Sequence, residues 1–365
     1  MTDSREFATK LARVRQMMEA SSLTGVALQK PTNLAWLLCA AEAFVARTVE
    51  RGSMTVIITP ASCHALMNAV EAPRLTAEEI ADLEISHHVF PWHQDKTDDL
   101  VRDLGGPCCV SDTGSAGTRA DEAAIIALQV PLTEAEIGRY RALGRDCGEA
   151  LGEAMRAVRP GMSEHEIAGL IAHRVLSRGI VAAVLLVATD ERVFRYRHPV
   201  PTGKKLERYA MGILVGRRGG LHASLTRSVH FGPAPDDLVA KQGAVARVDA
   251  AILAATRPGA TAGEVMAVAQ SAYAAAGYPD EWHCHHQGGA TGYQPRTWRA
   301  TPGGAQVIQA GQTFAWNPSL QGAKSEDTVI CLEHGVEVLT ATPAWPTIAV
   351  AEGGLTVERP AILTA

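Results

Sequence analysis

An internal repeat is the feature that most constrains how this chain can fold. The segments 159–179, RPGMSEHEIAGLIAHRVLSRG, and 257–277, RPGATAGEVMAVAQSAYAAAG, both begin Arg-Pro-Gly and both end on Gly. Each places Ser or Thr three residues before Glu, the pattern of a capping box at a helix start. Two unrelated helices can share this common motif, but the equal length and similar continuation favour two related halves. Two such halves would enclose a cleft, which is where ligands usually bind.

The part before the repeat has a different organisation. Between about residues 11 and 127, apolar runs alternate with helical patterns, which indicates an α/β layer domain. The apolar runs are TGVALQK, LAWLLCA, MTVIITP, HHVFPW and CCVSDTG, and helices are expected over 63–75 and 76–84. A further capping box, Thr133 to Glu136, opens the next unit. We therefore expect one domain over residues 1–130 and a second over 131–365.

Composition narrows the class of protein. A chain of 365 residues exceeds one ordinary domain, and its 47% hydrophobic and 20% charged residues are typical of a globular protein. The net charge of −5 gives no reason to expect nucleic acid or an anionic membrane as a partner. Seven cysteines without a CxxC pair predict free thiols in a reducing compartment. No apolar run approaches the ~20 residues that span a bilayer, so we expect a cytoplasmic protein.

Several motifs, in order along the chain, resemble the family of creatinase, prolidase and aminopeptidase P. They are GMSEHEI, YRHPVPTGKKL, LTRSVHFG, HHQGGATGY, FAWNP and KSEDTVICLEHGVEVLT. The resemblance covers nearly the whole chain. It implies an α/β creatinase-like N-terminal domain followed by an α+β C-terminal domain with the pita-bread fold. It also implies a homodimer.

The resemblance raises the question of metal binding. Metallopeptidases of this family hold two metal ions with two hairpin Asp, a His in a Gly-rich turn and two Glu. When Thr226 and Arg227 fix the alignment, only the last Glu is kept, as Glu326. The other positions hold Leu214, Leu225, Gly289 and Asn317. Two hard cations need several anionic oxygens, and the neighbouring Asp327 should point to the opposite strand face. We therefore expect no metal site and no cofactor.

Creatinase shows which chemistry remains possible without metal. It hydrolyses a C–N bond of a small amidino compound with a histidine, and the matching segment here is YRHPVPT, with His198. A neutral imidazole can take a proton from water and deliver it to the leaving nitrogen. Glu326 also matches a creatinase Glu, which could orient water or hold a cationic group. We predict His198 as acid/base, supported by Glu326; the alternative is a histidine that merely caps a strand.

The substrate-binding residues are predicted around this pair. The position of a second creatinase Glu holds Thr226, and arginines are numerous, so we expect a small acidic substrate and not a guanidinium. The residues expected to bind substrate are Arg218, Thr226, His285, His286, Tyr293, Arg296, Trp316 and Asn317. Adjacent histidines on an extended segment alternate faces and no second ligand pair is visible, so His285 and His286 are not expected to form a zinc site.

Three functions remain open from the sequence. The first is a metal-independent hydrolase, or a lyase, acting on a C–N bond of a small amide, amidino or acidic N-acyl compound. The second is an Xaa-Pro-type metallopeptidase, and the third is a non-catalytic binding relative. Whether His198 and Glu326 reach one common space separates the first from the third.

Overall fold

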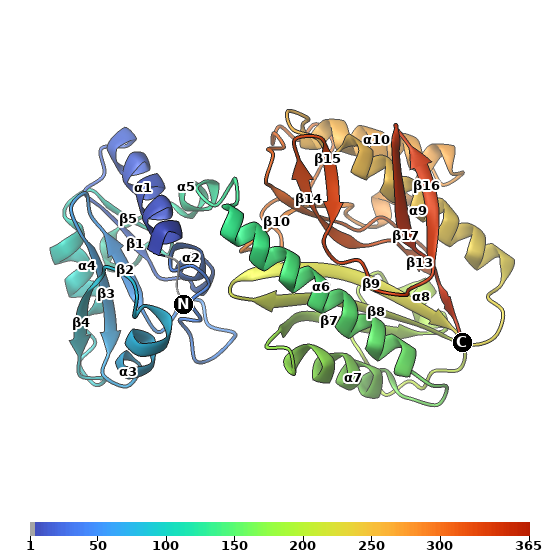
Figure 1. Cartoon of the computed structure of the whole chain (residues 1–365), viewed down its shortest axis with the longest axis horizontal. Coiled ribbons are helices and arrows are strands. Elements are labelled where there is room, and N and C mark those ends of the chain that lie inside the picture. Colours follow the sequence, from blue (N-terminus) through green and yellow to red (C-terminus); the bar gives the residue numbers. More distant parts are fainter. Residues whose placement is uncertain (1–3) are drawn as a thin grey trace. The chain divides into compact units, whose positions relative to one another are not determined.

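The computed structural model describes residues 4–365 and divides into two compact units, Met1–Glu136 and Ile137–Ala365 (Figure 1). The boundary at residue 130 stays a prediction. Across the described residues, no helix is both long enough and apolar enough to cross a bilayer. The seven cysteines are free thiols, as their spacing predicted.

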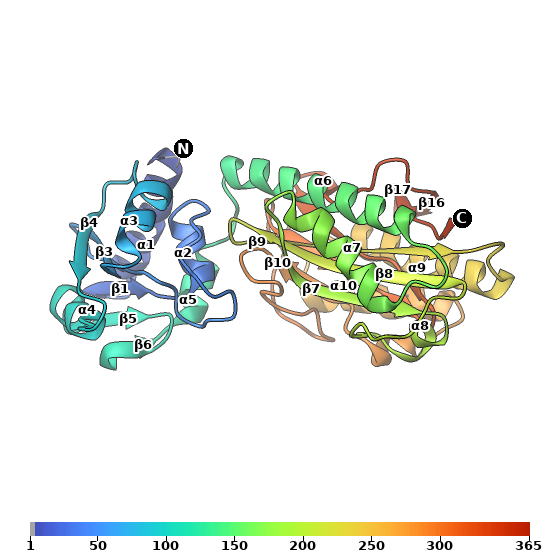
Figure 2. The same cartoon turned by 90° about the horizontal axis from the view of Figure 1, so that it is seen from below.

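The first unit is an α/β domain built on one six-stranded sheet. Its strands lie in the order β4-β3-β2-β1-β5-β6, and their bounds are β1 Gly25–Leu28, β2 Thr55–Ile58, β3 Cys63–Asn68, β4 Ser86–Phe90, β5 Cys109–Ser111 and β6 Arg119–Ala120. The helices are α1 Ser4–Ala20, α2 Pro31–Leu37, α3 Ala72–Arg74, η1 Leu75–Glu79, α4 Thr97–Gly105, η2 Ser115–Gly117 and α5 Glu122–Ala127. Val101 of α4 packs on Ala27, Ile57 and Leu66, and Figure 2 shows α1 across the sheet from α4.

Two local predictions in this unit are wrong. Residues 63–68, expected to be helical, form β3, which pairs antiparallel with β2. The reason is the turn before it, where Thr59 and Ser62 bond each other through both backbone and side chains and so return the chain as a hairpin. The apolar run LAWLLCA instead belongs largely to α2, which starts at Pro31, a residue favoured in the first helical turn.

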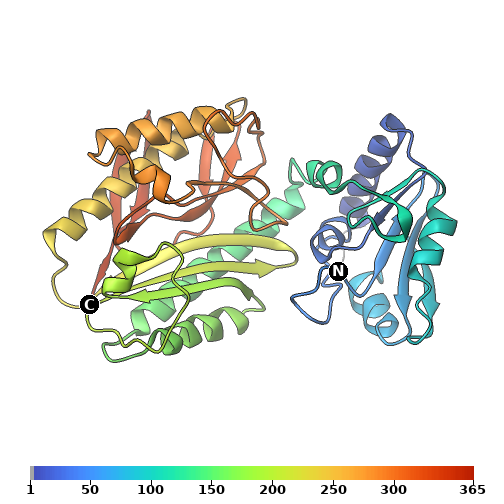
Figure 3. The same ribbon diagram turned by 180° about the vertical axis from the view of Figure 1, so that it is seen from behind.

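The second unit has the two-layered pita-bread architecture. Its helices are α6 Glu134–Ala157, which starts in the first unit, α7 Glu164–Leu176, α8 Glu191–Arg195, α9 Asp236–Ala255, α10 Ala262–Ala275 and η3 Glu281–Cys284. The strands of its two four-stranded sheets are β7 Val181–Thr189, β8 Tyr209–Arg218, β9 Leu221–His230 and β18 Leu363–Thr364, then β10 Gly288–Thr291, β11 Thr313–Trp316, β14 Asp327–Leu332 and β15 Gly335–Val338. Two hairpins complete it, β12 Ser319–Leu320 with β13 Ala323–Lys324 and β16 Thr347–Glu352 with β17 Leu355–Pro360. Helices α6 and α7 lie by the sheet that contains β7, β8 and β9. Helices α9 and α10, yellow to orange in Figure 3, lie by the sheet that contains β10, β11 and β14.

The internal repeat is confirmed in detail. Ser163 and Thr261 each cap the following helix, and each capping box is complete through its Glu. The glycine before each cap has positive φ, 86° at Gly161 and 84° at Gly259, a conformation that favours glycine. Each of these glycines also donates its backbone N–H to a returning strand-like segment, at 2.8 Å and 2.9 Å. The two halves therefore share both helix start and packing.

The two sheets meet along β9 and β14. Ser224 donates its backbone N–H to Thr328 Oγ1 at 2.7 Å, and Thr328 Oγ1 donates to the Ser224 carbonyl at 3.0 Å. One step along, the Thr226 N–H donates to the Glu326 carbonyl at 3.2 Å. These bonds fix the register of β9 against the strand that carries Glu326.

A buried ion network lies behind this junction. Asp327 binds Arg227 Nη2 through Oδ1 at 2.9 Å and Arg359 Nη2 through Oδ2 at 2.8 Å. Arg359 also binds Asp249 of α9 at 2.6 Å, and all four side chains are at most 2% exposed. The expectation that Asp327 points away from Glu326 is thereby confirmed. The network joins β9, β14, β17 and α9.

We predict that Arg359→Met destabilises the protein by about 3–5 kcal/mol, because it leaves Asp249 uncompensated and removes one of the two partners of Asp327. Urea denaturation measures the loss. Arg141→Met is the matched control: Arg141 pairs with Glu337 at 2.7 Å, but these side chains are 48% and 34% exposed, so the cost should stay below about 1 kcal/mol. Equal losses in both variants would contradict the role given to burial.

Candidate functional site

The site is built around Glu326, which lies directly before β14 and is 3% exposed. Its carboxylate oxygen Oε2 accepts a hydrogen bond from Thr226 Oγ1 at 2.5 Å. The same oxygen forms an ion pair with Lys324 Nζ at 2.8 Å. Thr226 was predicted here and Lys324 was not. Side chains two residues apart on an extended segment share a face. The spacing of Lys324 and Glu326 in KSED could therefore have predicted that Lys324 lies beside Glu326.

His198 lies in the loop after α8, beside two other histidines. Its Nε2 is 3.2 Å from His285 Nε2, and its ring centroid is 5.8 Å from that of His286. His285 is held on its other side, where Nδ1 lies 3.0 Å from Ser319 Oγ. One nitrogen of each imidazole lies within 4.8 Å of the others, a group that could hold a metal ion. The expectation that adjacent His285 and His286 diverge is therefore wrong, since His198 lies close to both.

The environment keeps these imidazoles neutral. Burial, followed by the charge of Lys324, lowers the pKa of His285 to about 2. Burial, followed by the charge of Arg296, lowers the pKa of His286 to about 4. The pKa of His198 is lowered by burial and Lys324, while Glu326 opposes the shift. The charges of Lys324 and Glu326 therefore act on His198 in opposite directions.

The pleat of the hairpin shows that Leu214 and Leu225, the residues aligned with the aspartates of the family, do not lie on the strand face of Thr226. Leu214 and Leu225 lie opposite each other, on the same face as Gly212, where an added Cβ would meet Met155 of α6 and Ile171 of α7. Both leucines therefore face the helices. The opposite face, which carries Thr226, presents Ile213, Val215 and Ser224. Residues 209–230 contain no Asp or Glu, so neither face offers a carboxylate.

Asn317 and the glycine-rich strand form the next part of the site. Trp316 pairs with Asp327, which puts Asn317 in register with Glu326, and Asn317 Oδ1 is buried without a hydrogen-bond partner among residues 4–365. Gly289 has φ 150°, and a Cβ there would lie 2.2 Å from the Trp298 carbonyl oxygen. This backbone has no space for a side chain at position 289, whereas Asn317 offers a free acceptor.

The remaining predicted residues divide into two groups. Arg296 is half-buried and donates to the Ala315 carbonyl at 2.7 Å, and its charge acts on His286. Tyr293 is 1% exposed. Two predictions disagree with the structure: Arg218 binds Asp146 of α6 at 2.7 Å, on the helix side of the hairpin, and Trp316 lies in the core that α9 and α10 cover. Their side chains alternate with the residues that face Glu326, which explains the difference.

Arg299 was missed because no spacing rule links its loop to the cleft. Its charge lowers the pKa of both His198 and His286.

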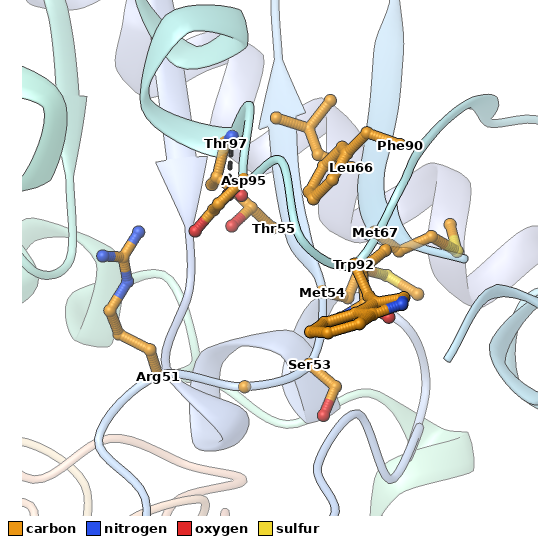
Figure 4. Close-up of a pocket in the computed structure, with 12 residues that line it drawn as sticks. Arg51, Ser53, Met54, Thr55, Leu66, Met67, Phe90, Trp92, Asp95 and Thr97 are labelled. Carbon is orange, nitrogen blue, oxygen red and sulfur yellow. Dashed lines mark hydrogen bonds between the residues drawn. The ribbon is translucent and has the colours of Figure 1, made fainter. Parts of the chain in front are cut away.

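The first unit contains a cavity of about 310 Å³ (Figure 4). Its lining includes Arg51, Met54, Trp92 and Asp95, and Figure 4 shows Asp95 next to Thr97. None of the predicted site residues lines it.

We predict that stability falls as the pH drops below about 6.5, because His285 binds a proton in the unfolded chain but not in the native protein. Its contribution is fully present above pH 6.5 and falls by about 1.4 kcal/mol per pH unit until its native pKa of about 2. Urea denaturation at several pH values between 7 and 5 gives the slope of the unfolding free energy against pH. In His285→Asn this slope should be smaller, by an amount that corresponds to about one bound proton. The exposed His173→Asn on α7 is the control, and equal slopes in the two variants would refute the assignment.

Comparisons with known proteins place this geometry in a family. The model of metallopeptidase family M24 matches residues 138–338. A probable dipeptidase PepE of Mycobacterium tuberculosis is 24% identical, with 93% of this chain and 96% of that protein aligned. Dipeptidase PepE from Mycobacterium ulcerans has a similar structure, with TM-score 0.78, 20% identity and coverage of 99% and 98%. So does the prolidase from Pyrococcus horikoshii OT3, with TM-score 0.78, 19% identity and coverage of 92% and 98%. These structures confirm the predicted two-domain fold, and the family match, over more than half of the sequence, shows that the chain belongs to metallopeptidase family M24.

Proposed function

We propose that this protein hydrolyses a C–N bond in a small peptide-like or N-acyl compound without the two-metal centre of its family. In this proposal His198 is the acid/base and Glu326 supports it. The observation that carries it is the buried ion pair of Lys324 and Glu326, whose charges both act on the exposed His198. Membership of a hydrolase family supplies the reaction class.

The hydrogen bonding of His198 suits a base. When the Ser319 hydroxyl donates to His285 Nδ1, the proton of the neutral His285 ring is on Nε2 and points at His198. His198 Nε2 then carries a lone pair, and its Nδ1 carries the proton. When a substrate enters and breaks the contact with His285, His198 Nε2 can accept a proton from water. His198 later donates this proton to the leaving nitrogen.

The donor set does not fit two divalent metal ions. Such a centre needs several anionic oxygens, and the hairpin 209–230 has none. A histidine cannot stand at Gly289 without displacing the Trp298 backbone. The remaining carboxylate, Glu326, is already bonded to an ammonium and a hydroxyl.

The substrate class follows from charge. The positive charges of Lys324, Arg296 and Arg299 act on the histidine cluster, and the negative charge of Glu326 acts on His198. Guanidinium and ammonium groups bind carboxylates well, so we propose an anionic substrate such as a dipeptide or N-acyl amino acid. A homodimer is part of the proposal, and sedimentation equilibrium would test it.

One observation favours a second function, a metal-dependent dipeptidase. His198, His285 and His286 could bind a single transition metal, and the matched family consists of metallopeptidases. The nearby charges of Lys324 and Arg299 oppose a divalent cation at that position.

We predict that His198→Ala lowers kcat/KM by about 10²–10⁴-fold, the usual contribution of an acid/base group. The assay uses a panel of Xaa-Pro dipeptides, N-acyl amino acids and amidino acids. His173→Ala, an exposed histidine on α7, should retain the activity. Unchanged turnover in His198→Ala would remove His198 from the mechanism.

Elemental analysis of protein purified without chelator separates the two functions. Turnover with less than about 0.1 equivalent of metal is expected from the proposal. About one equivalent that is lost in His286→Asn, together with metal-dependent peptide cleavage, would establish the dipeptidase. About two equivalents would refute our reading of the donor set. Absence of both metal and turnover would favour a non-catalytic relative.

A further inference from the structure

Lys324 is an unusual group to find in this position. It lies on β13, with Ser319 of β12 opposite, and its side chain is 5% exposed. Gln242 of α9 donates its side-chain amide to the Lys324 carbonyl at 3.3 Å and so holds the backbone. A buried ammonium is costly unless it is paired and hydrogen-bonded, so a lysine kept here requires an explanation.

The pairing of Lys324 is incomplete. An ammonium has three N–H donors, and in the part of the chain that the structure covers, Glu326 Oε2 is the single polar partner that we find for them. Ser319, which lies opposite Lys324 on the same strand face, has its hydroxyl 3.0 Å from His285 Nδ1, so Lys324 is on the face that carries this histidine contact. Donor capacity therefore remains on a strand face that is linked to His198 through Ser319 and His285.

The neighbours of Lys324 also leave polar atoms without partners. Asn317 Oδ1, Ser224 Oγ and His286 Nδ1 are buried with no hydrogen-bond partner within residues 4–365. Asn317 is in register with Glu326, and Ser224 shares a strand face with Thr226, the other partner of Glu326. Unsatisfied buried polar atoms are rare, and Asn317 and Ser224 both lie on strand faces that adjoin Glu326. A bound ligand would satisfy them.

We propose that Lys324 is a catalytic residue, whose ammonium holds the carbonyl oxygen of the scissile bond and the negative charge that this oxygen gains. This inference rests on the proposed hydrolysis and adds its electrophile. Glu326 holds the ammonium in place through the ion pair at 2.8 Å. The fixed positive charge that other hydrolases obtain from a metal ion is then supplied by the chain itself.

The reaction balances with these groups alone. Water attacks the carbonyl carbon, its proton passes to His198, and the carbonyl π electrons move to the oxygen beside Lys324. When the tetrahedral intermediate collapses, the C=O bond reforms, the C–N bond breaks, and protonated His198 gives its proton to the leaving nitrogen. The products are a carboxylic acid and an amine, and both His198 and Lys324 return to their starting states.

We predict that Lys324→Met lowers kcat by about 10²–10³-fold with KM changed by less than about threefold, as for loss of one oxyanion donor. Lys324→Arg keeps the charge and should lose less than about tenfold. Ethylammonium should restore part of the activity of Lys324→Ala. The control is Lys205→Met, an exposed lysine that should retain full activity. Equal kcat in Lys324→Met and wild type would overturn the proposal.

A binding measurement keeps the inference testable whatever the turnover. Inorganic phosphate, a tetrahedral anion, is titrated into the full chain and followed by calorimetry. We expect its affinity to fall at least tenfold in Lys324→Met and to be unchanged in Lys205→Met. Lack of turnover on the substrate panel would count against the proposed function, whereas phosphate affinity that is equal in Lys324→Met and wild type would refute the role of Lys324 as an anion holder.

Misfolding would mimic a catalytic loss, because Lys324→Met leaves Glu326 buried without its counter-ion. The double variant Lys324→Met/Glu326→Gln removes both charges and is expected to recover stability, seen as a higher thermal midpoint, without recovering phosphate affinity. Recovery of phosphate affinity in the double variant would show that Lys324 acted only on the fold.

Discussion

The alternation of side chains at Glu326 and Asp327 is the constraint on which this structure depends. Asp327 points back into the ion network with Arg227 and Arg359, which joins strands of both sheets to α9. Glu326 consequently lies on the opposite face of the strand, where Thr226 and Lys324 bind it. Because the period of a strand is two, a shift of one residue would exchange these roles and bury Glu326 in the network. The structural carboxylate thus fixes the position of the functional one.

Most of the fold follows from patterns that the sequence displays. The capping boxes that begin at Ser163 and Thr261 depend on local hydrogen bonds, and local rules predict such features well. The strand at 63–68 was predicted as a helix, because its direction is set by the turn at Thr59 and by pairing with β2, both outside the segment. Tertiary pairing overrides such local preference.

The site was only partly predictable for the same reason. The meeting of Thr226 with Glu326 follows from two motifs, and the cluster of His198 with His285 and His286 needs the fold to bring a loop after α8 to the start of β10. Arg218 was chosen from a concentration of arginines and Trp316 from the alignment, and both were misplaced because neither observation tells which face of a strand a side chain occupies. In a pleated hairpin, an error of one residue changes cleft lining into core.

The hairpin without acids has a consequence for how the protein reaches its native state. A sheet that packs several carboxylates into one cleft must neutralise them before it can close, so its folding is coupled to the supply of cations. Here Ile213, Val215, Ser224 and Thr226 line that face and carry no charge, and the counter-ion of Glu326 is a side chain of the same unit. Closure of this hairpin against its neighbours therefore requires no external cation to offset hairpin carboxylates, because residues 209–230 carry none.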